Sequence, residues 1–178
     1  MIISLNEKIK SRRLEIGLKQ KDIQNLSFRY FDENEVVNEN YFQKVESAKF
    51  QNLELWTLYK LSSILESDIL FSNTENKVDF KIDGQIHSIN YSSLLPIDQN
   101  YSKNHRGAEY KNQFLTLVGT YIRDSRNEFN LTQIEFSRNC SISRATLQRL
   151  ELGLVSAKLN TIIKVLFTIY KLKDERNQ

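Results

Sequence analysis

The last third of the chain carries the clearest pattern of apolar and polar positions. Leu147 and Leu150 are spaced to share one side of a short helix, and the polar residues around them face outward. Ser143 suits the N-cap of this helix, and Gly153 can end it in a left-handed conformation. The pattern predicts a helix that buries its leucines and exposes a polar face.

A second short helix is expected just before it, from Thr132 to Arg138. Thr132 is a suitable N-cap, and Glu135 completes a capping box. Residues 139–141 are too polar and too poor in helix formers to continue this helix, so the chain turns there. Two short helices joined by a tight turn make a helix-turn-helix.

The outward face of the second helix carries side chains that can donate to phosphates and to the edges of guanine and adenine. Gln133, at the start of the preceding helix, is a further candidate for phosphate contact. For Thr146 and Gln148, plain surface is an equal alternative. The candidate DNA-binding residues are Gln133, Ser143, Arg144, Ala145, Thr146, Gln148 and Arg149.

This stretch resembles the phage-repressor and Cro-type helix-turn-helix family, also called the xenobiotic-response-element family of bacterial regulators. The resemblance covers residues 114–172 and rests on Leu131-Thr132-Gln133, Ile142-Ser143 and Leu150-Glu151-Leu152-Gly153. The family also carries an Arg seven residues before the Gln, paired with the Glu, and Arg126 occupies that position. The resemblance implies a lambda-repressor-like bundle of helices that binds double-stranded DNA, with Arg126 and Glu151 as a structural ion pair.

The first third of the chain reads as a divergent copy of the last. Arg13 precedes Gln20 by seven residues, as Arg126 precedes Gln133, and Glu46 follows where a partner for Arg13 is expected. We therefore interpret the chain as two helix-turn-helix bundles, in which the Arg13–Glu46 pair repeats the second ion pair.

The first copy departs from the family pattern in its turn and on its outward face. Gln20 and Glu46 are 26 residues apart, against 18 in the second copy, so eight residues within 29–37 enlarge the turn. Glu39 aligns with Arg144, and phosphates repel an acidic residue there. Tyr41 and Phe42 are expected to make this surface adhesive. The possible DNA or partner surface comprises Gln20, Glu39, Asn40, Tyr41, Gln43 and Lys44.

We expect this first copy to bind DNA weakly or not at all and to serve pairing or partner contact. The opposite case stays open, because Asn40, Gln43 and Lys44 can each contact a groove.

Between the copies, residues 77–90 alternate apolar and polar positions about Asp83-Gly84, which predicts a small β-hairpin. Residues 92–107 read as a linker. A longer helix should run from Ala108 through Phe129, and its early apolar residues, Phe114 among them, should pack against the hairpin or a second subunit.

Composition and charge fit this organisation. Only five Gly and one Pro among 178 residues indicate a mostly α protein. The expected divisions are 1–72 for the divergent unit, 73–107 for the hairpin and linker, and 108–178 for the DNA-binding domain. Residues 108–178 carry four more basic than acidic residues, whereas residues 1–72 carry one more acidic than basic residue. A phosphate-facing module needs such a positive balance.

The sequence lacks the residue patterns that catalysis, metal binding or membrane insertion would require. No nucleophile–base constellation or phosphate-cradling glycine loop is present, so no catalytic residue and no enzymatic activity are expected. One Cys and two separated His argue against a metal, and no cofactor is expected. Cys140 should be nearly inert and Trp56 part of a core. The absence of a long apolar run argues against a membrane span, so the expected location is the cytoplasm.

The residues thus favour a sequence-specific transcriptional regulator, a repressor, that binds double-stranded DNA. The resemblance implies a homodimer, and an intrachain pseudo-dimer of the two copies is the competing geometry. The alternative function is a protein-interaction module, or an antitoxin-like autoregulator, whose first unit binds a protein partner.

Overall fold

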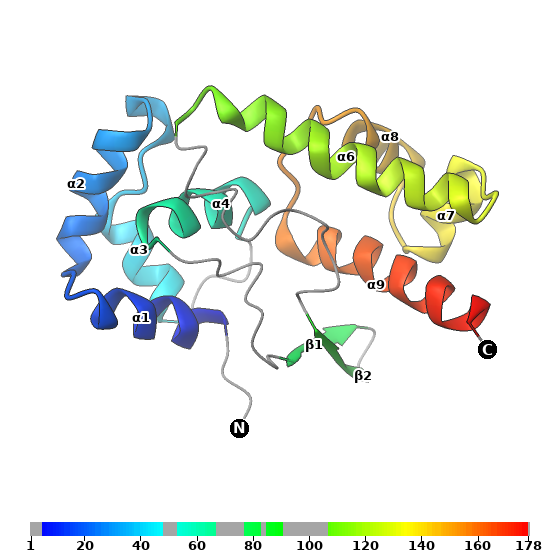
Figure 1. The fold of residues 1–178 in the computed structure, drawn as a ribbon, viewed down its shortest axis with the longest axis horizontal. Coiled ribbons are helices and arrows are strands. Elements are labelled where there is room, and N and C mark those ends of the chain that lie inside the picture. Colours follow the sequence, from blue (N-terminus) through cyan, green and yellow to red (C-terminus); the bar gives the residue numbers. More distant parts are fainter. Residues whose placement is uncertain (1–4, 48–52, 67–76, 83–84, 91–106, 178) are drawn as a thin grey trace.

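The computed structural model describes residues 5–47, 53–66, 77–82, 85–90 and 107–177. These ranges are mostly helical and hold eight α-helices, one 3-10 helix and one pair of strands. The N-terminal helices are α1 (Leu5–Glu15), α2 (Gln20–Tyr30), α3 (Glu39–Glu46) and α4 (Leu55–Ile64), with the 3-10 helix η1 (Glu33–Glu35) after α2. The C-terminal helices are α6 (Tyr110–Glu128), α7 (Gln133–Asn139), α8 (Arg144–Glu151) and α9 (Leu159–Arg176). Figure 1 shows these two groups on opposite sides of the molecule.

Five of the described helices are followed by a residue with a left-handed backbone, among them α4 by Glu66 and α7 by Ser141. Gly17 follows α1 with φ 73°, Asn130 follows α6 with φ 54°, and Gly153 follows α8 with φ 67°. Glycine and asparagine tolerate this conformation better than other residues, so each can stop a helix and reverse the chain. The predicted role of Gly153 is confirmed.

Two strands lie between α4 and α6 in the sequence. β1 (Lys77–Ile82) pairs antiparallel with β2 (Gln85–Asn90), with Lys77 opposite Asn90 and Ile82 opposite Gln85. The predicted turn at Asp83-Gly84 and nearly all of the predicted linker lie outside the described residues.

Helix α4 is buried along its whole length. Trp56 is 2% exposed and stacks on Tyr59, with ring centroids 4.8 Å apart and an angle of 17° between the planes. Phe31 meets Trp56 edge-on at 6.0 Å. Because aromatic rings bury large apolar areas, this cluster anchors the N-terminal core, as predicted for Trp56.

The early part of α6 packs differently from the prediction. Phe114 is fully buried, and its ring centroid lies 4.5 Å from that of Tyr59 and 6.2 Å from that of Trp56. The expected partners were the hairpin or a second subunit, but Phe114 instead covers α4. The reason is that α4 is buried on all its sides, so its large apolar residues are covered from more than one direction.

Helices α6 and α8 approach closely at Gly119. A Cβ atom at this position would lie 2.3 Å from the carbonyl oxygen of Leu150 and 2.9 Å from that of Glu151. Only glycine permits this approach, which sets the position of α8 against α6. None of the helices in the described ranges is both long enough and apolar enough to cross a membrane.

Candidate nucleic-acid interface

Side-chain caps define the start of both α7 and α8. The Thr132 hydroxyl accepts from the backbone N–H of Glu135 at 3.3 Å, and the Glu135 carboxylate accepts from the Thr132 N–H at 2.8 Å. Hydrogen bonds from the hydroxyl and backbone N–H of Thr132 lower the pKa of Glu135 below its usual value. The Ser143 hydroxyl accepts from the Thr146 N–H at 3.0 Å. The predicted capping box and N-cap are confirmed.

The two faces of α8 differ in burial and chemistry. Leu147 and Leu150 are 0% and 3% exposed and pack into the core. The exposed side carries Arg144, Ala145, Gln148 and Arg149, and Ser143 is exposed as the cap. Thr146 is half-buried, and its hydroxyl lies 2.8 Å from that of Ser143. The helix therefore presents two guanidinium groups and one amide to solvent.

A buried carboxylate ties the ends of the C-terminal bundle together. Glu151 is 4% exposed and accepts from Arg126 Nε at 2.6 Å and from Gln133 Nε2 at 2.8 Å. Arg126 also donates to the carbonyl oxygen of Leu131 at 2.8 Å. One ion pair thus joins α6, the start of α7 and the end of α8, and the predicted pairing is present. Gln133 keeps a second amide proton, because its NH₂ group carries two donors.

The N-terminal helices repeat this network atom for atom. Glu46 accepts from Arg13 Nε at 2.6 Å and from Gln20 Nε2 at 2.7 Å, and Arg13 donates to the carbonyl oxygen of Leu18 at 2.7 Å. Arg13 is 7% exposed. The same three side chains, at the same spacing before the turn, therefore connect α1, α2 and α3.

The outward face of α3 is polar but differs from that of α8. Asn40, Gln43 and Lys44 are exposed, and Glu39 is half-buried and accepts from Gln43 Nε2 at 3.2 Å. The expected contribution of Phe42 to this surface is wrong, because Phe42 is 0% exposed and belongs to the core.

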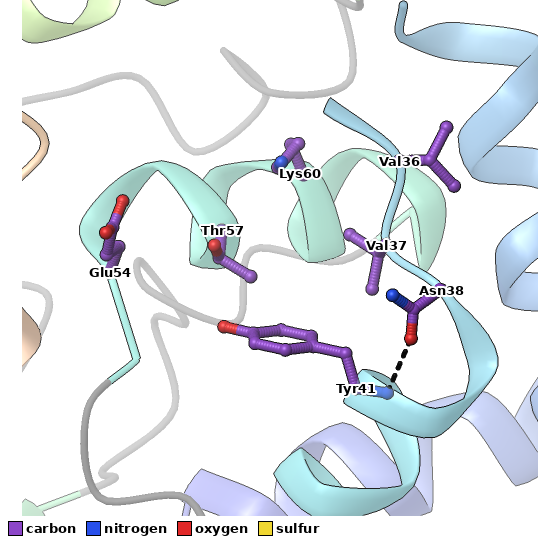
Figure 2. Close-up of a pocket in the computed structure, with 7 residues that line it drawn as sticks. All are labelled: Val36, Val37, Asn38, Tyr41, Glu54, Thr57 and Lys60. Atoms are coloured by element: carbon purple, nitrogen blue, oxygen red, sulfur yellow. Dashed lines mark hydrogen bonds between the residues drawn. The ribbon is translucent and has the colours of Figure 1, made fainter. Parts of the chain in front are cut away.

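Tyr41 lies in a pocket rather than on the open face of α3. The pocket has a volume of about 280 Å³ and its lining residues come from α3, α4 and the segment before α3: Val36, Val37, Asn38, Tyr41, Glu54, Thr57 and Lys60. Figure 2 shows the Tyr41 ring beneath α4, with Asn38 capping α3 beside it. Burial raises the pKa of Tyr41, and its hydrogen bond with Thr57 opposes this shift.

Glu35, in the enlarged turn, forms a cluster of charges that sequence reasoning missed. Its carboxylate accepts from Trp56 Nε1 at 2.9 Å, from Lys60 Nζ at 2.9 Å and from Lys111 of α6. Burial acts to raise the pKa of Glu35, but the hydrogen bonds from the two lysines and Trp56 outweigh it and lower the pKa to about 2. No local sequence signal links positions 76 residues apart, as Glu35 and Lys111 are.

Cys140 is a buried thiol. It is 2% exposed, and burial raises its pKa to about 11. A thiol with so high a pKa stays protonated near neutral pH and is a poor nucleophile.

A comparison with protein families found one match, which lies within the C-terminal helices. Residues 122–166 match the family model described as helix-turn-helix, which is of the Cro/C1 type. Residues 122–166 are therefore similar to a helix-turn-helix domain. The match spans about a quarter of the chain and includes α7, α8 and the Arg126–Glu151 pair. A search of curated proteins and a search of solved structures gave no match.

The helix-turn-helix match indicates what the exposed face of α8 could bind. Domains of this kind belong to regulatory families that bind DNA and are generally not enzymes. The match therefore suggests a DNA-binding transcriptional regulator. It does not extend to α1–α4, although these helices contain the same Arg–Glu–Gln network.

Proposed function

We propose that this chain is a cytoplasmic, sequence-specific regulator that binds double-stranded DNA and represses transcription by occupying its site. The observation that carries the proposal is the exposed face of α8, where Arg144, Gln148 and Arg149 stand free of the core inside a matched helix-turn-helix domain. Their donors suit the major-groove edges of guanine and adenine.

The mechanism divides the contacts into two classes. Arg144 and Arg149 read bases, and each good bidentate contact discriminates by about 1–3 kcal/mol. Gln133 contacts a phosphate through the amide proton that Glu151 does not take, so the Arg126–Glu151 pair orients a DNA contact. Ser143 and Thr146 hold the first turn of α8 in place.

We assign α1–α4, within residues 1–72, to a divergent second helix-turn-helix unit, and residues 108–178 to the main DNA-binding unit. The Arg13–Glu46–Gln20 network supports this assignment, because it reproduces the contacts of Arg126, Glu151 and Gln133. The net negative charge of residues 1–72 argues for the weaker DNA contact in this unit.

A second candidate function is recognition of a protein partner by the N-terminal helices, as in an autoregulating antitoxin. Leu14, which is 58% exposed, and Phe28, which is 51% exposed, are the large apolar side chains that such a partner would cover. Exposed apolar groups are common singly, so this candidate ranks second. A Leu14→Ser/Phe28→Ser variant that keeps its DNA affinity and loses a captured partner would support it.

The experiment for the main proposal is selection from a random duplex library, with wild type beside Arg144→Ala/Arg149→Ala. We expect wild type to enrich one motif and the double variant to bind that motif more weakly by about 2–6 kcal/mol, because two base contacts are lost. The matched control is Arg123→Ala/Lys171→Ala, which removes two exposed positive charges from α6 and α9 and should enrich the same motif. Failure of wild type to enrich any motif would contradict the proposal.

A further inference from the structure

The two groups of helices meet through equivalent backbone positions. Glu54 immediately precedes α4 and Lys158 immediately precedes α9, and these two residues form an antiparallel bridge. The N–H of Leu55 donates to the carbonyl oxygen of Ala157 at 3.0 Å, and the N–H of Leu159 donates to that of Leu53 at 2.7 Å. Each contact is the counterpart of the other.

Reciprocal contact between like positions is the signature of a two-fold interface. In a symmetric dimer, residue i of one copy meets residue j of the other, and j meets i. Here both copies belong to one chain. Figure 1 agrees with this relation, since α2 and α7, the corresponding helices, lie at opposite ends of the molecule.

The residues that reinforce this interface are those by which the two copies differ. The enlarged turn supplies Glu35, which accepts from Lys111 of α6 across the interface. The early part of α6 supplies Phe114, which packs against Trp56 and Tyr59 of α4. The inserted turn and the longer helix thus hold the N-terminal helices against the C-terminal ones.

The two outward helix faces are unequal. Glu39 of α3 occupies the position of Arg144 in α8, and Lys44 occupies that of Arg149. Glu39 is half-buried and accepts from Gln43. Among the described positions just compared, the α3 face therefore offers one exposed cation, Lys44, and the α8 face offers two, Arg144 and Arg149. A guanidinium also presents a rigid, planar fork of donors to a guanine edge, whereas an ammonium is a compact charge on a flexible stem and loses more conformational freedom per hydrogen bond.

We propose that a single chain occupies one DNA site as an intrachain pseudo-dimer, with α1–α4 in the place of a second copy, and that α8 reads its half of the site more strongly than α3 reads the other. This inference rests on the proposed function and names its target, an asymmetric duplex site rather than a palindrome bound by two chains.

The test uses the full chain and the duplex that it enriches from the random library. Native mass spectrometry of the complex counts the chains on one duplex, and the motif itself reports symmetry. Affinities are then compared for wild type, Arg149→Ala and Lys44→Ala, which truncate corresponding cations. We expect one chain per duplex, an asymmetric motif, a loss of about 5- to 150-fold for Arg149→Ala and a loss below about 5-fold for Lys44→Ala.

The outcomes separate this inference from the function beneath it. A palindromic motif carrying two chains per duplex would overturn the pseudo-dimer and leave sequence-specific binding intact. Equal losses for Arg149→Ala and Lys44→Ala would overturn the unequal reading. No enriched motif at all would remove the proposed function, and this inference with it.

Discussion

Glu151 illustrates how a single buried carboxylate can position a recognition surface. It accepts from Arg126 and Gln133, and because Glu151 is only 4% exposed, its carboxylate has almost no access to water. A buried ion pair adds little net stability over an apolar pair, but loss of one partner leaves the other charge uncompensated. The pair therefore fixes the positions of α6, α7 and α8 relative to one another, and removal of either partner should lower the free energy of unfolding.

We predict that Glu151→Gln lowers the free energy of unfolding by about 3–5 kcal/mol, because Arg126 stays buried without its counter-charge. Urea denaturation followed by circular dichroism measures the change. The control is Glu175→Gln, which removes an exposed partner of Lys171 and should cost less than about 1 kcal/mol. Equal stability of Glu151→Gln and wild type would show that the pair is dispensable.

Glu35 gives a prediction for pH. Its ordinary pKa of 4.5 is lowered to about 2 in the folded chain, so the carboxylate contributes stability above about pH 4.5 and loses it as the pH falls toward 2. Between about pH 5 and pH 2.5, wild type should lose about 1–2 kcal/mol more of its unfolding free energy than Glu35→Gln. Parallel pH profiles for the two proteins would contradict the cluster.

The residue scale also shows what sequence could and could not predict. The pairing of Arg126 with Glu151 was predictable from the family resemblance, which implies an ion pair at these positions. Phe42 was misread, although it aligns with the inward Leu147 and the correct interpretation was available from that alignment. The contact between Glu35 and Lys111 was beyond reach, because only the packing of α4 against α6 creates it.

At the scale of elements, α8 depends on its caps and on its approach to α6. The caps were predictable from Thr132, Ser143 and Gly153, because capping is local chemistry. The close approach at Gly119 was not, since a glycine within a helix resembles any other weak helix former until the neighbouring backbone is known.

Gly119→Ala tests this approach. Alanine favours a helix by about 1 kcal/mol, yet its Cβ would meet the Leu150 carbonyl oxygen, so we expect a net loss of about 1–3 kcal/mol in unfolding free energy. Thermal and urea unfolding measure it, with Gln113→Ala at an exposed position of α6 as the control within about 0.5 kcal/mol of wild type. A more stable Gly119→Ala would mean that α6 and α8 stand further apart.

For the whole molecule, the joint between the two groups of helices decides whether they act as one body. Trp56 is the sole tryptophan and contacts Phe114 across that joint. Sequence predicted two similar halves from the repeat, and it left their arrangement open, because the joint is built from the inserted turn and the early part of α6, where the copies differ.

The joint predicts cooperative unfolding. Trp56 fluorescence and circular dichroism at the helical wavelength should give coincident urea transitions, because unfolding either group strips the buried surface of the other. Phe114→Ala should lower the free energy of unfolding by about 3–5 kcal/mol. Its two transitions should then either separate or both move to lower urea concentration. Two separate transitions in wild type would mean that the halves fold independently.

The central claim is that α8 reads a DNA sequence, and the ratio of two affinities tests it most directly. The dissociation constants for the enriched duplex and for a scrambled duplex are measured at about 150 mM salt, where non-specific phosphate binding is weak. We predict a ratio of at least about 1,000 for wild type and for Arg123→Ala/Lys171→Ala, and a ratio lower by at least about 30-fold for Arg144→Ala/Arg149→Ala. A wild-type ratio near one, with both affinities falling alike as salt rises, would contradict the account.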